Sequence, residues 1–483
     1  MIDSRSGRKV RAIDHAAAPT QASSGLIKLT LALYLAIMSL DALRKTTGLP
    51  GSSIAVIYAL TAIIYVATLM ARQRQRNMLP SFLPLTLLFV TAWCMLNAII
   101  RQVPAPLAIL GWSSYVFFVP LAYIGAKLMA DESAVRVLRV VAVIGSLVGI
   151  GTIASAILGP SAPALLQPIV PSVGYHTANG GNVYLAPSIF ADSEEACEQL
   201  LVALFAWTAL MLVGHDSIKR GRFTVLGLLI FAGIIAAERR AGIYIAIVGL
   251  IMLLAAGSGR SQSSPTHMRR PAFTGGGRWQ LVLALSMTAL GSVILINVLG
   301  ANLILSFLTS SSLGAPLRLM VASAHPAALY GQGTGTSTQG SYILGATSFS
   351  GTNAQGPYTG VSIDGRSFIT AEGGLAKTWL ELGLVGVLLY GAVFITIIGP
   401  ALRSFGKLDC IGRALLAVTI GLGILFLKGH QSLDDPLIQP LFWMAAGGVW
   451  GRLRRPSAMA DSHDLLTPVL PVFARRPLSA GSL

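Results

Sequence analysis

Long apolar runs alternate along this chain with short polar connections. A membrane-spanning helix needs about 20 apolar residues, with about 17 to 25 tolerated. The pattern therefore predicts an all-α polytopic membrane protein of about twelve transmembrane helices. The expected spans cover residues 26–43, 52–71, 82–100, 107–129, 137–158, 198–214, 222–237, 241–257, 279–300, 376–399, 411–428 and 436–450. The last two are the least distinct, because a polar segment separates two short apolar runs.

Composition supports this class. The chain is 54% hydrophobic and only 11% charged, whereas soluble globular proteins carry about 25% charged residues. With a cytoplasmic N-terminus, 26 of the 35 Lys and Arg residues fall on the inner side. Basic connections mark the cytoplasmic side of a membrane protein, so both termini are expected there. The net charge of +16 thus encodes orientation and does not indicate nucleic-acid binding.

The connections divide the chain into five parts. We expect a cytoplasmic tail over 1–25, nine spans over 26–300, a large outer loop over 301–375, three spans over 376–450 and a cytoplasmic tail over 451–483. The large loop contains 12 Gly and 19 Ser or Thr, but also aromatic residues such as Tyr330. Loops of this length are more often functional or disordered than simple connectors. The aromatic residues favour a folded element.

Three adjacent charged residues, Glu238, Arg239 and Arg240, interrupt the apolar run over 223–257. The flanking spans are short, so the turn between them should lie near the outer headgroups. The arginines can reach toward lipid phosphates from there. Alternatively they form an anion-binding clamp, because guanidinium groups match phosphate oxygens bidentately.

A second arginine candidate lies in the outer loop. Arg318 opens a short stretch, predicted to be helical, that ends in the glycines of "GQGTG" over 331–335. A G-x-G-x-G sequence alone is a weak motif, and a flexible turn explains it equally well. Its interest is that an arginine, a glycine turn and several hydroxyls share the outer side with Arg239 and Arg240.

Four carboxylates lie near the same side. Glu372, at the exit of the large loop, can act as a general base, or simply as a carboxylate favoured at a helix N-terminus. Glu381 lies inside the next apolar run, where we expect a buried partner such as an arginine. Asp192 or Ser193 can cap the helix that follows, with Glu195 in its first turn. A role in capping this helix is enough to explain most of the acidic residues in the segment.

In their order along the chain, these segments resemble the O-antigen ligase and polysaccharide polymerase superfamily of bacterial inner-membrane proteins. That family shows an F-x-x-P-N/S-x-x-A segment, an arginine-bearing tip, a loop with R-L and G-x-G, and an E-x-x-x-L or H-N-x-x-L entry into E-L-G-x-x-G. The matching residues here are Phe190 to Ala196, Arg239 and Arg240, Arg318 and Leu319 with Gly331 and Gly333, and Glu372 with Glu381, Leu382, Gly383 and Gly386.

The resemblance implies a GT-C-like fold in the bacterial inner membrane and glycosyl transfer on its periplasmic face. The donor and acceptor would be undecaprenyl-diphosphate-linked oligosaccharides. Neither cofactor nor metal is expected, because arginines can neutralise the diphosphate leaving group, and one direct displacement inverts the anomeric centre. Other polysaccharide-assembly proteins and the lipid bilayer are the expected partners, and nucleic acid is not.

The resemblance also suggests roles for individual residues. Arg239, Arg240 and Arg318 would bind the diphosphate, with Arg366 and Tyr330 as further substrate contacts. Glu372 would activate the acceptor hydroxyl and complete the catalytic set. The supporting residues would be Glu381, Glu195 and Asp192.

One difference selects a branch of the superfamily. Ligases that transfer a finished glycan to an acceptor carry a histidine at the position of Glu372, nine residues before Glu381, so its absence favours a repeat-unit polymerase. Ser193 and Glu194 also replace the proline and asparagine of the Phe190 segment. A ligase remains the first alternative. A transporter or flippase is the second, suggested by charges at membrane depth and disfavoured by the lack of an inverted repeat.

Overall fold

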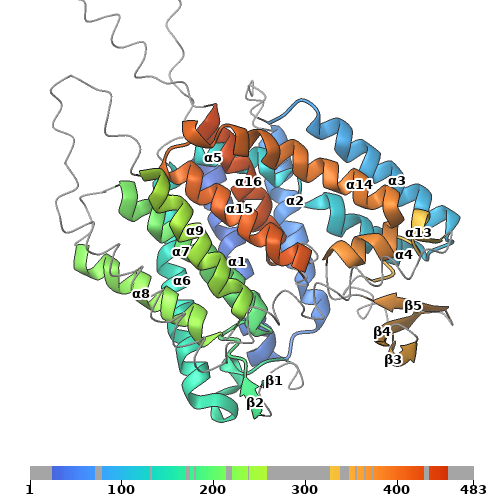
Figure 1. Ribbon diagram of the computed structural model, residues 1–483, viewed down its shortest axis with the longest axis horizontal. Coiled ribbons are helices and arrows are strands. Elements are labelled where there is room, and N and C mark those ends of the chain that lie inside the picture. The colour runs from blue at the N-terminus through green and yellow to red at the C-terminus, as the bar shows by residue number, and fades with distance from the viewer. Residues whose placement is uncertain are drawn as a thin grey trace, which may run out of the picture.

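The computed structural model describes residues 24–70, 79–130, 133–169, 175–178, 181–213, 220–237, 239–257, 327–337, 347–353, 356–363, 366–370, 374–428 and 435–454. Most of them are helical, and Figure 1 shows the helices packed in a bundle with two small sheets at its edge. The span expected at 279–300 lies outside the described residues.

The α-helices are α1 (Ser24–Thr47), α2 (Ala55–Met70), α3 (Leu83–Ile100), α4 (Ala105–Trp112), α5 (Leu121–Met129), α6 (Ser133–Leu158), α7 (Ser193–Val213), α8 (Arg220–Ala236), α9 (Arg240–Gly257), α13 (Ala327–Tyr330), α14 (Gly374–Arg403), α15 (Cys410–Lys428) and α16 (Gln439–Leu453). Short 3₁₀ turns are η1 (Gly51–Ile54), η3 (Gly159–Ser161), η4 (Ala164–Leu166) and η8 (Phe405–Lys407), and η2 (Ser113–Phe117) is a π-helical turn. Prolines stand in the first turns of α3, α4 and α16, where a missing N–H costs no helical hydrogen bond.

Eight described helical segments are long and apolar enough to cross a membrane, so the chain is a polytopic membrane protein. The segments are Gly25–Thr47, Ser52–Met70, Leu83–Ile100, Ala105–Met129, Ser133–Ser161, Ser193–Val213, Gly374–Arg403 and Cys410–Leu427. Each coincides with one of the twelve expected spans. The apolar parts of α8 and α9 are shorter, at Phe223–Ala236 and Ala241–Ile251, and α16 has 15 residues.

Helices α5 and α16 pack closely against each other. Gly447 and Gly451 of α16 face the backbone of Ala122 and Ala126 in α5, and a β-carbon on Gly447 would lie 1.8 Å from the Ala122 carbonyl oxygen. Small residues let helices approach closely, which matters in lipid because the hydrophobic effect does not drive helices together there. An aromatic cluster joins α14, α15 and α16 nearby; its members are Tyr390, Phe394, Phe426, Phe442 and Trp443.

The span expected over 107–129 is interrupted in its middle. After α4 the chain makes the π-helical turn η2, and α5 begins only after Pro120. Proline has no N–H to donate and its ring clashes with the preceding helical turn, so a regular helix does not run through it. The interruption directs Tyr115 of η2 toward α14, where its hydroxyl is hydrogen-bonded.

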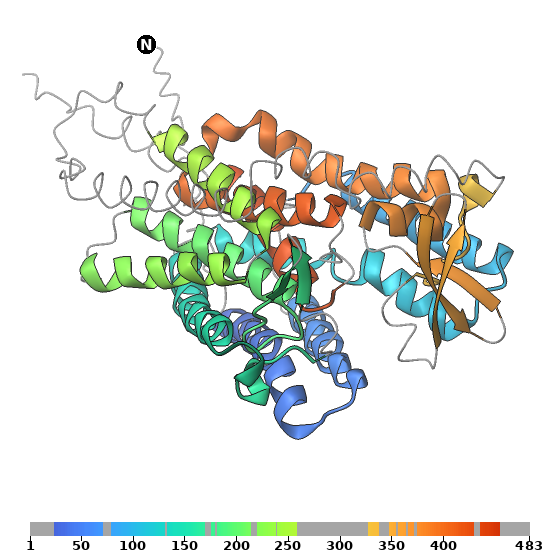
Figure 2. The same cartoon turned by 60° about the horizontal axis from the view of Figure 1, so that its bottom comes forward.

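Two small antiparallel sheets lie in the connections. β1 (Tyr175–Ala178) and β2 (Gly181–Tyr184) form a hairpin. β3 (Thr347–Asn353), β4 (Gly356–Ile363) and β5 (Arg366–Thr370) form a sheet in that order, with Val361 opposite Phe368. Figure 2 shows this sheet beside the first part of α14. The large loop expected over 301–375 thus contains folded elements.

Candidate functional site

The N-terminus of α7 is capped by Asp192. Its Oδ1 accepts hydrogen bonds from the backbone N–H groups of Glu194 and Glu195, at 2.7 and 3.0 Å. This confirms the predicted capping segment. Burial raises the pKa of the Asp192 carboxyl, and the nearby Glu194 carboxylate raises it further, against the lowering effect of Arg239 and of the two N–H groups.

Arg239 lies in the turn between α8 and α9 and reaches across to the start of α7. Its Nε donates to Ser193 Oγ at 2.8 Å, and its Nη1 lies 2.7 Å from Glu194 Oε1. The first turn of α7 presents Glu194 within reach of Arg239, and the predicted contact of Arg239 with a lipid diphosphate stays a prediction. Arg240 begins α9. Glu238 and the Arg240 side chain lie outside the described part.

Three further carboxyl groups gather beside Asp192, and with it they form what we call the carboxyl cluster: Asp41, Asp192, Glu195 and Asp435. The backbone N–H of Ala191 donates to Asp41 Oδ2 at 2.8 Å and to Glu195 Oε2 at 3.2 Å, which brings these two carboxyl groups together. Asp435 lies close enough for its charge to act on Glu195, and the charge of Asp41 acts on both. Residues from α1, α7 and the turn before α16 thus meet at one end of the bundle.

Two cations of α1 accompany the carboxyl cluster. Arg44 Nη1 lies 2.9 Å from Asp41 Oδ1, and Lys45 Nζ donates to the carbonyls of Leu165 and Ser188 at 3.2 and 3.1 Å. Burial raises the pKa of Asp435 to about 7, and the negative charges of Asp41 and Asp192 contribute to the rise. A carboxyl group with such a pKa can take up and release protons near neutral pH.

Among the described residues, no group of three or more His, Cys, Asp and Glu side chains has the arrangement of a metal site. Sequence reasoning predicted Asp192 and Glu195 here but not Asp41, Arg44, Lys45 or Asp435. An acidic residue within an apolar span, as at Asp41, is rare and functional by default. That signal was present in the sequence, but it did not reveal which carboxyl groups Asp41 meets.

Glu381 belongs to a second polar region, inside α14. It is fully buried; its Oε2 accepts from the Tyr115 hydroxyl at 3.0 Å and its Oε1 from the backbone N–H of Ser337 at 2.8 Å. Lys377, one turn earlier, donates to Ser114 Oγ at 3.4 Å. We expected a buried partner such as an arginine for Glu381; its partners described here include the Tyr115 hydroxyl group and the Ser337 backbone N–H.

The glycine-rich loop over 331–337 is buried against this broken part of α14. Gly383 has φ 67°, which interrupts the helix, and the N–H groups of Gln332 and Gly333 donate to the carbonyls of Leu380 and Glu381 at 2.6 and 3.1 Å. Irregular backbone at membrane depth is tolerated only where the protein satisfies its polar groups. The "GQGTG" segment is therefore a loop fixed by hydrogen bonds to α14, and not the flexible turn that its sequence alone also allowed.

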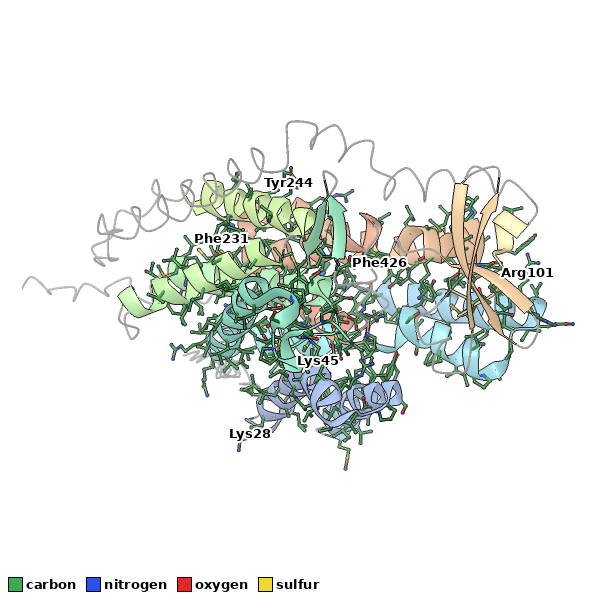
Figure 3. The ribbon with its side chains drawn as sticks, turned by 90° about the horizontal axis from the view of Figure 1, so that it is seen from below. Lys28, Lys45, Arg101, Phe231, Tyr244 and Phe426 are labelled. Atoms are coloured by element: carbon green, nitrogen blue, oxygen red, sulfur yellow. The ribbon has the colours of Figure 1, made fainter. Side chains whose placement is uncertain are left out.

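Tyr330 and Arg366 lie beside this second region. Tyr330 is 45% exposed, its carbonyl accepts from Asn97 Nδ2, and its ring centroid lies 6.1 Å from that of Trp93. Arg366 Nη1 donates to the carbonyls of residues 101 and 102 at 3.3 and 3.0 Å. Figure 3 shows Arg101 at one end of the molecule and Lys45 near its middle. The structure therefore does not bring Arg366 to Arg239.

Two expected site residues, Arg318 and Glu372, lie outside the described residues. No model of a known protein family matches the chain, and no curated protein matches it significantly.

Proposed function

We propose that this protein is a membrane glycosyltransferase that joins undecaprenyl-diphosphate-linked oligosaccharide repeat units, as a polysaccharide polymerase of the O-antigen ligase and polymerase superfamily. The observation that carries the proposal is the contact of Arg239 with Ser193 and Glu194. It joins two family-like segments, the arginine tip and the Phe190 segment, that lie 46 residues apart in the sequence.

A second contact between family-like segments supports the proposal. The G-x-G loop at Gly331 and Gly333 packs on the E-L-G segment at Glu381, with the Gly333 N–H donating to the Glu381 carbonyl at 3.1 Å. Four segments that resemble the family in their order along the chain are thus also in contact, two by two, in the fold. The proposal includes a GT-C-like fold of twelve spans in the bacterial inner membrane, with the carboxyl cluster on the periplasmic side and both termini in the cytoplasm.

In the proposed reaction an acceptor hydroxyl attacks the anomeric carbon of the donor sugar. A new C–O bond forms, the bond to the diphosphate breaks, and the hydroxyl proton passes to a base. Arg239, Arg240 and Arg318 neutralise the leaving diphosphate, as positioned cations do for developing charge, and Glu372 receives the proton. We leave Arg366 out of the diphosphate set, because its guanidinium binds two backbone carbonyls.

Incubating the purified protein with a lipid-linked oligosaccharide tests this proposal, with product length read on a gel. Arg239→Ala, Arg318→Ala and Glu372→Gln should each slow elongation about tenfold or more, since one charge-assisted hydrogen bond contributes about 1.5 to 3 kcal/mol. Arg403→Ala, an exposed arginine at the far end of α14, should elongate normally. Full activity of all three site variants would contradict the assignment of residues. Absence of any glycosidic bond formation by the wild type would contradict the proposed function.

A ligase differs from a polymerase in cells lacking the protein. Without a polymerase, cells hold single repeat units; without a ligase, they hold long polymer that is not attached to its acceptor. Glu372 in place of a ligase histidine favours the polymerase.

One observation favours transport as a second candidate. Transporters hold substrates at broken helices whose freed backbone groups lie near the membrane midplane, and α14 is broken at Gly383. The freed carbonyls of Leu380 and Glu381 are, however, already occupied by the loop at 332–333. Proteoliposomes that move a labelled lipid-linked oligosaccharide across the bilayer without forming glycosidic bonds would establish transport.

A further inference from the structure

Ser188, in the connection before α7, has a backbone conformation that is unusual for a residue other than glycine. Its φ angle is 58°, in the left-handed region, and the residue is fully buried. Residues with a β-carbon keep this conformation only where their surroundings impose it, and they are concentrated at functional sites. The contacts of Ser188 therefore show which parts of the protein impose its conformation.

Two helices hold Ser188 in place. Near the end of α1, Lys45 Nζ donates to the Ser188 carbonyl at 3.1 Å and to the Leu165 carbonyl at 3.2 Å. The Ser188 hydroxyl donates to the Val148 carbonyl of α6 at 3.1 Å. Gly151 of α6 leaves room for this hydroxyl, because a β-carbon there would lie 2.5 Å from Ser188 Oγ. Ser188 is thus fixed by α1 and by α6.

The same end of α1 also holds the residues that lead into α7. Asp41 is fully buried, and its Oδ2 accepts from the backbone N–H of Ala191 at 2.8 Å. Asp41 and Lys45 stand four positions apart, so they share one face of α1. Two charged side chains of this face therefore hold residues 188–191 through hydrogen bonds to their backbone.

Ser193 connects this segment to Arg239. The Ser193 side chain is buried, and its hydroxyl oxygen accepts from Arg239 Nε at 2.8 Å. Glu194 Oε1 lies 2.7 Å from Arg239 Nη1. A continuous path of contacts thus runs from α1 through residues 188–193 to the guanidinium group of Arg239. A shift of this segment would displace the two oxygen atoms that orient the guanidinium group.

We propose that Lys45 and Asp41 are positioning residues, which hold residues 188–191 against α1 and thereby set the orientation in which Arg239 meets its anionic substrate. The inference rests on the proposed function, in which Arg239 binds the diphosphate of the lipid-linked donor. A group that is already oriented as the reaction requires loses less freedom when the substrate binds. Charged side chains suit this task, because their hydrogen bonds are stronger than those between neutral groups.

Substitutions of Lys45 test the proposal in elongation kinetics. Lys45→Met removes the ammonium group but keeps a long side chain, and it should lower kcat/KM for the lipid-linked donor about tenfold. Lys45→Arg retains a cation and should recover most of the lost activity. Lys28→Met is the matched control on the same helix, because Lys28 is exposed at the other end of α1, and Figure 3 shows it at the edge of the molecule. This variant should behave like the wild type.

Two further measurements separate positioning of Arg239 from a general loss of structure. If Lys45 acts through Arg239, Lys45→Met should have little further effect in an Arg239→Ala background, so the two reductions in kcat/KM should not multiply. Hydrogen exchange measured by mass spectrometry needs no activity. Lys45→Met should speed exchange of the backbone N–H groups in residues 188–195 and 239–243, and it should leave those of α14 unchanged.

The outcomes distinguish this inference from the proposed function. Wild-type exchange rates in residues 188–195 of Lys45→Met, or reductions that multiply fully with those of Arg239→Ala, would overturn the positioning role. A wild type that forms no glycosidic bond would overturn the proposed function instead, and the exchange rates would then decide the positioning role. If Lys45→Met fails to fold, Gly151→Ala tests the same path, because its β-carbon displaces Ser188 without removing a charge. Wild-type exchange rates and kinetics in Gly151→Ala would also overturn the positioning role.

Discussion

The guanidinium group of Arg239 lies 2.7 Å from the carboxylate of Glu194 and ties the start of α9 to the first turn of α7. Both side chains are partly exposed, at 23% and 31%, and such ion pairs contribute at most about 1 kcal/mol. The pair therefore contributes more to the orientation of the guanidinium than to stability, and an anionic ligand has to compete with Glu194 for it.

Glu194→Gln should consequently strengthen binding of an anionic donor. Removing the competing carboxylate frees Arg239, so KM for the lipid-linked donor should fall up to about fivefold, equivalent to about 1 kcal/mol. Arg239→Lys should raise KM, because an ammonium lacks the bidentate fork. Steady-state elongation kinetics measure both. Identical donor KM values for the wild type, Glu194→Gln and Arg239→Lys would exclude Arg239 from the donor site.

Glu381→Ala should destabilise the protein strongly. The substitution leaves the Ser337 N–H and the Tyr115 hydroxyl without their acceptor in a buried site, and each unsatisfied group costs about 1 to 3 kcal/mol. Tyr115→Phe removes only one of the two donors and should cost less than Glu381→Ala. Thermal unfolding in detergent compares the two variants. A larger loss for Tyr115→Phe would contradict this account of Glu381.

Gly383→Ala should also lower the stability of the folded protein, because the backbone at this position does not accommodate a side chain. Gly383 has φ 67°, and a β-carbon there would lie 2.3 Å from the Leu329 carbonyl oxygen. Alanine would have to straighten the break or displace α13, so we expect a loss of about 2 kcal/mol or more. Gly391→Ala, in the same helix with no atom within 4 Å of the added carbon, is the matched control. It should be neutral or slightly stabilising, because alanine is the better helix former.

Stability should fall with rising pH through the titration of Asp435. Its pKa rises from the ordinary value near 4 to about 7 in the folded protein. The folded state therefore holds more protons than the unfolded state between these values, so the stabilisation is present at low pH and is lost as the pH approaches about 7. Asp435→Asn should remove roughly 2 to 3 kcal/mol of the difference between about pH 5 and about pH 8. Denaturant unfolding of the wild type and of Asp435→Asn at both pH values measures this difference. The same pH dependence in both proteins would contradict a raised pKa of Asp435.

The proposed orientation can be tested by cysteine labelling. Leu49, after α1, and Gly406, after α14, are both exposed and lie at connections on opposite sides of the expected topology. In a Cys410→Ala background, an impermeant maleimide should label Leu49→Cys in intact cells and Gly406→Cys only after permeabilisation. The two remaining cysteines, Cys94 and Cys197, are buried. The reverse pattern of labelling would invert the topology.

Several parts of the candidate site followed from local sequence. Asp192 caps α7 because a short carboxylate side chain can reach N–H groups two and three residues ahead. The short apolar runs around Arg239 placed it at a helix turn. The partners of these residues did not follow, since Glu194 lies on another helix, and the meeting of Glu195 with Asp41 and Asp435 depends on the packing of three distant segments.

Eight of the expected membrane spans are what the sequence by itself determined. A helix satisfies its backbone through hydrogen bonds between residues four apart, and the bilayer thickness sets the apolar length, so each span is a local property. Only the tertiary structure decided where α14 breaks and which carboxyl groups share the end of the bundle. The break depends on Gly383 meeting Leu329 and Gly331, and the carboxyl groups of Asp41 and Glu195 meet at an N–H 150 residues from Asp41. Contacts over such separations arise only when the helices pack.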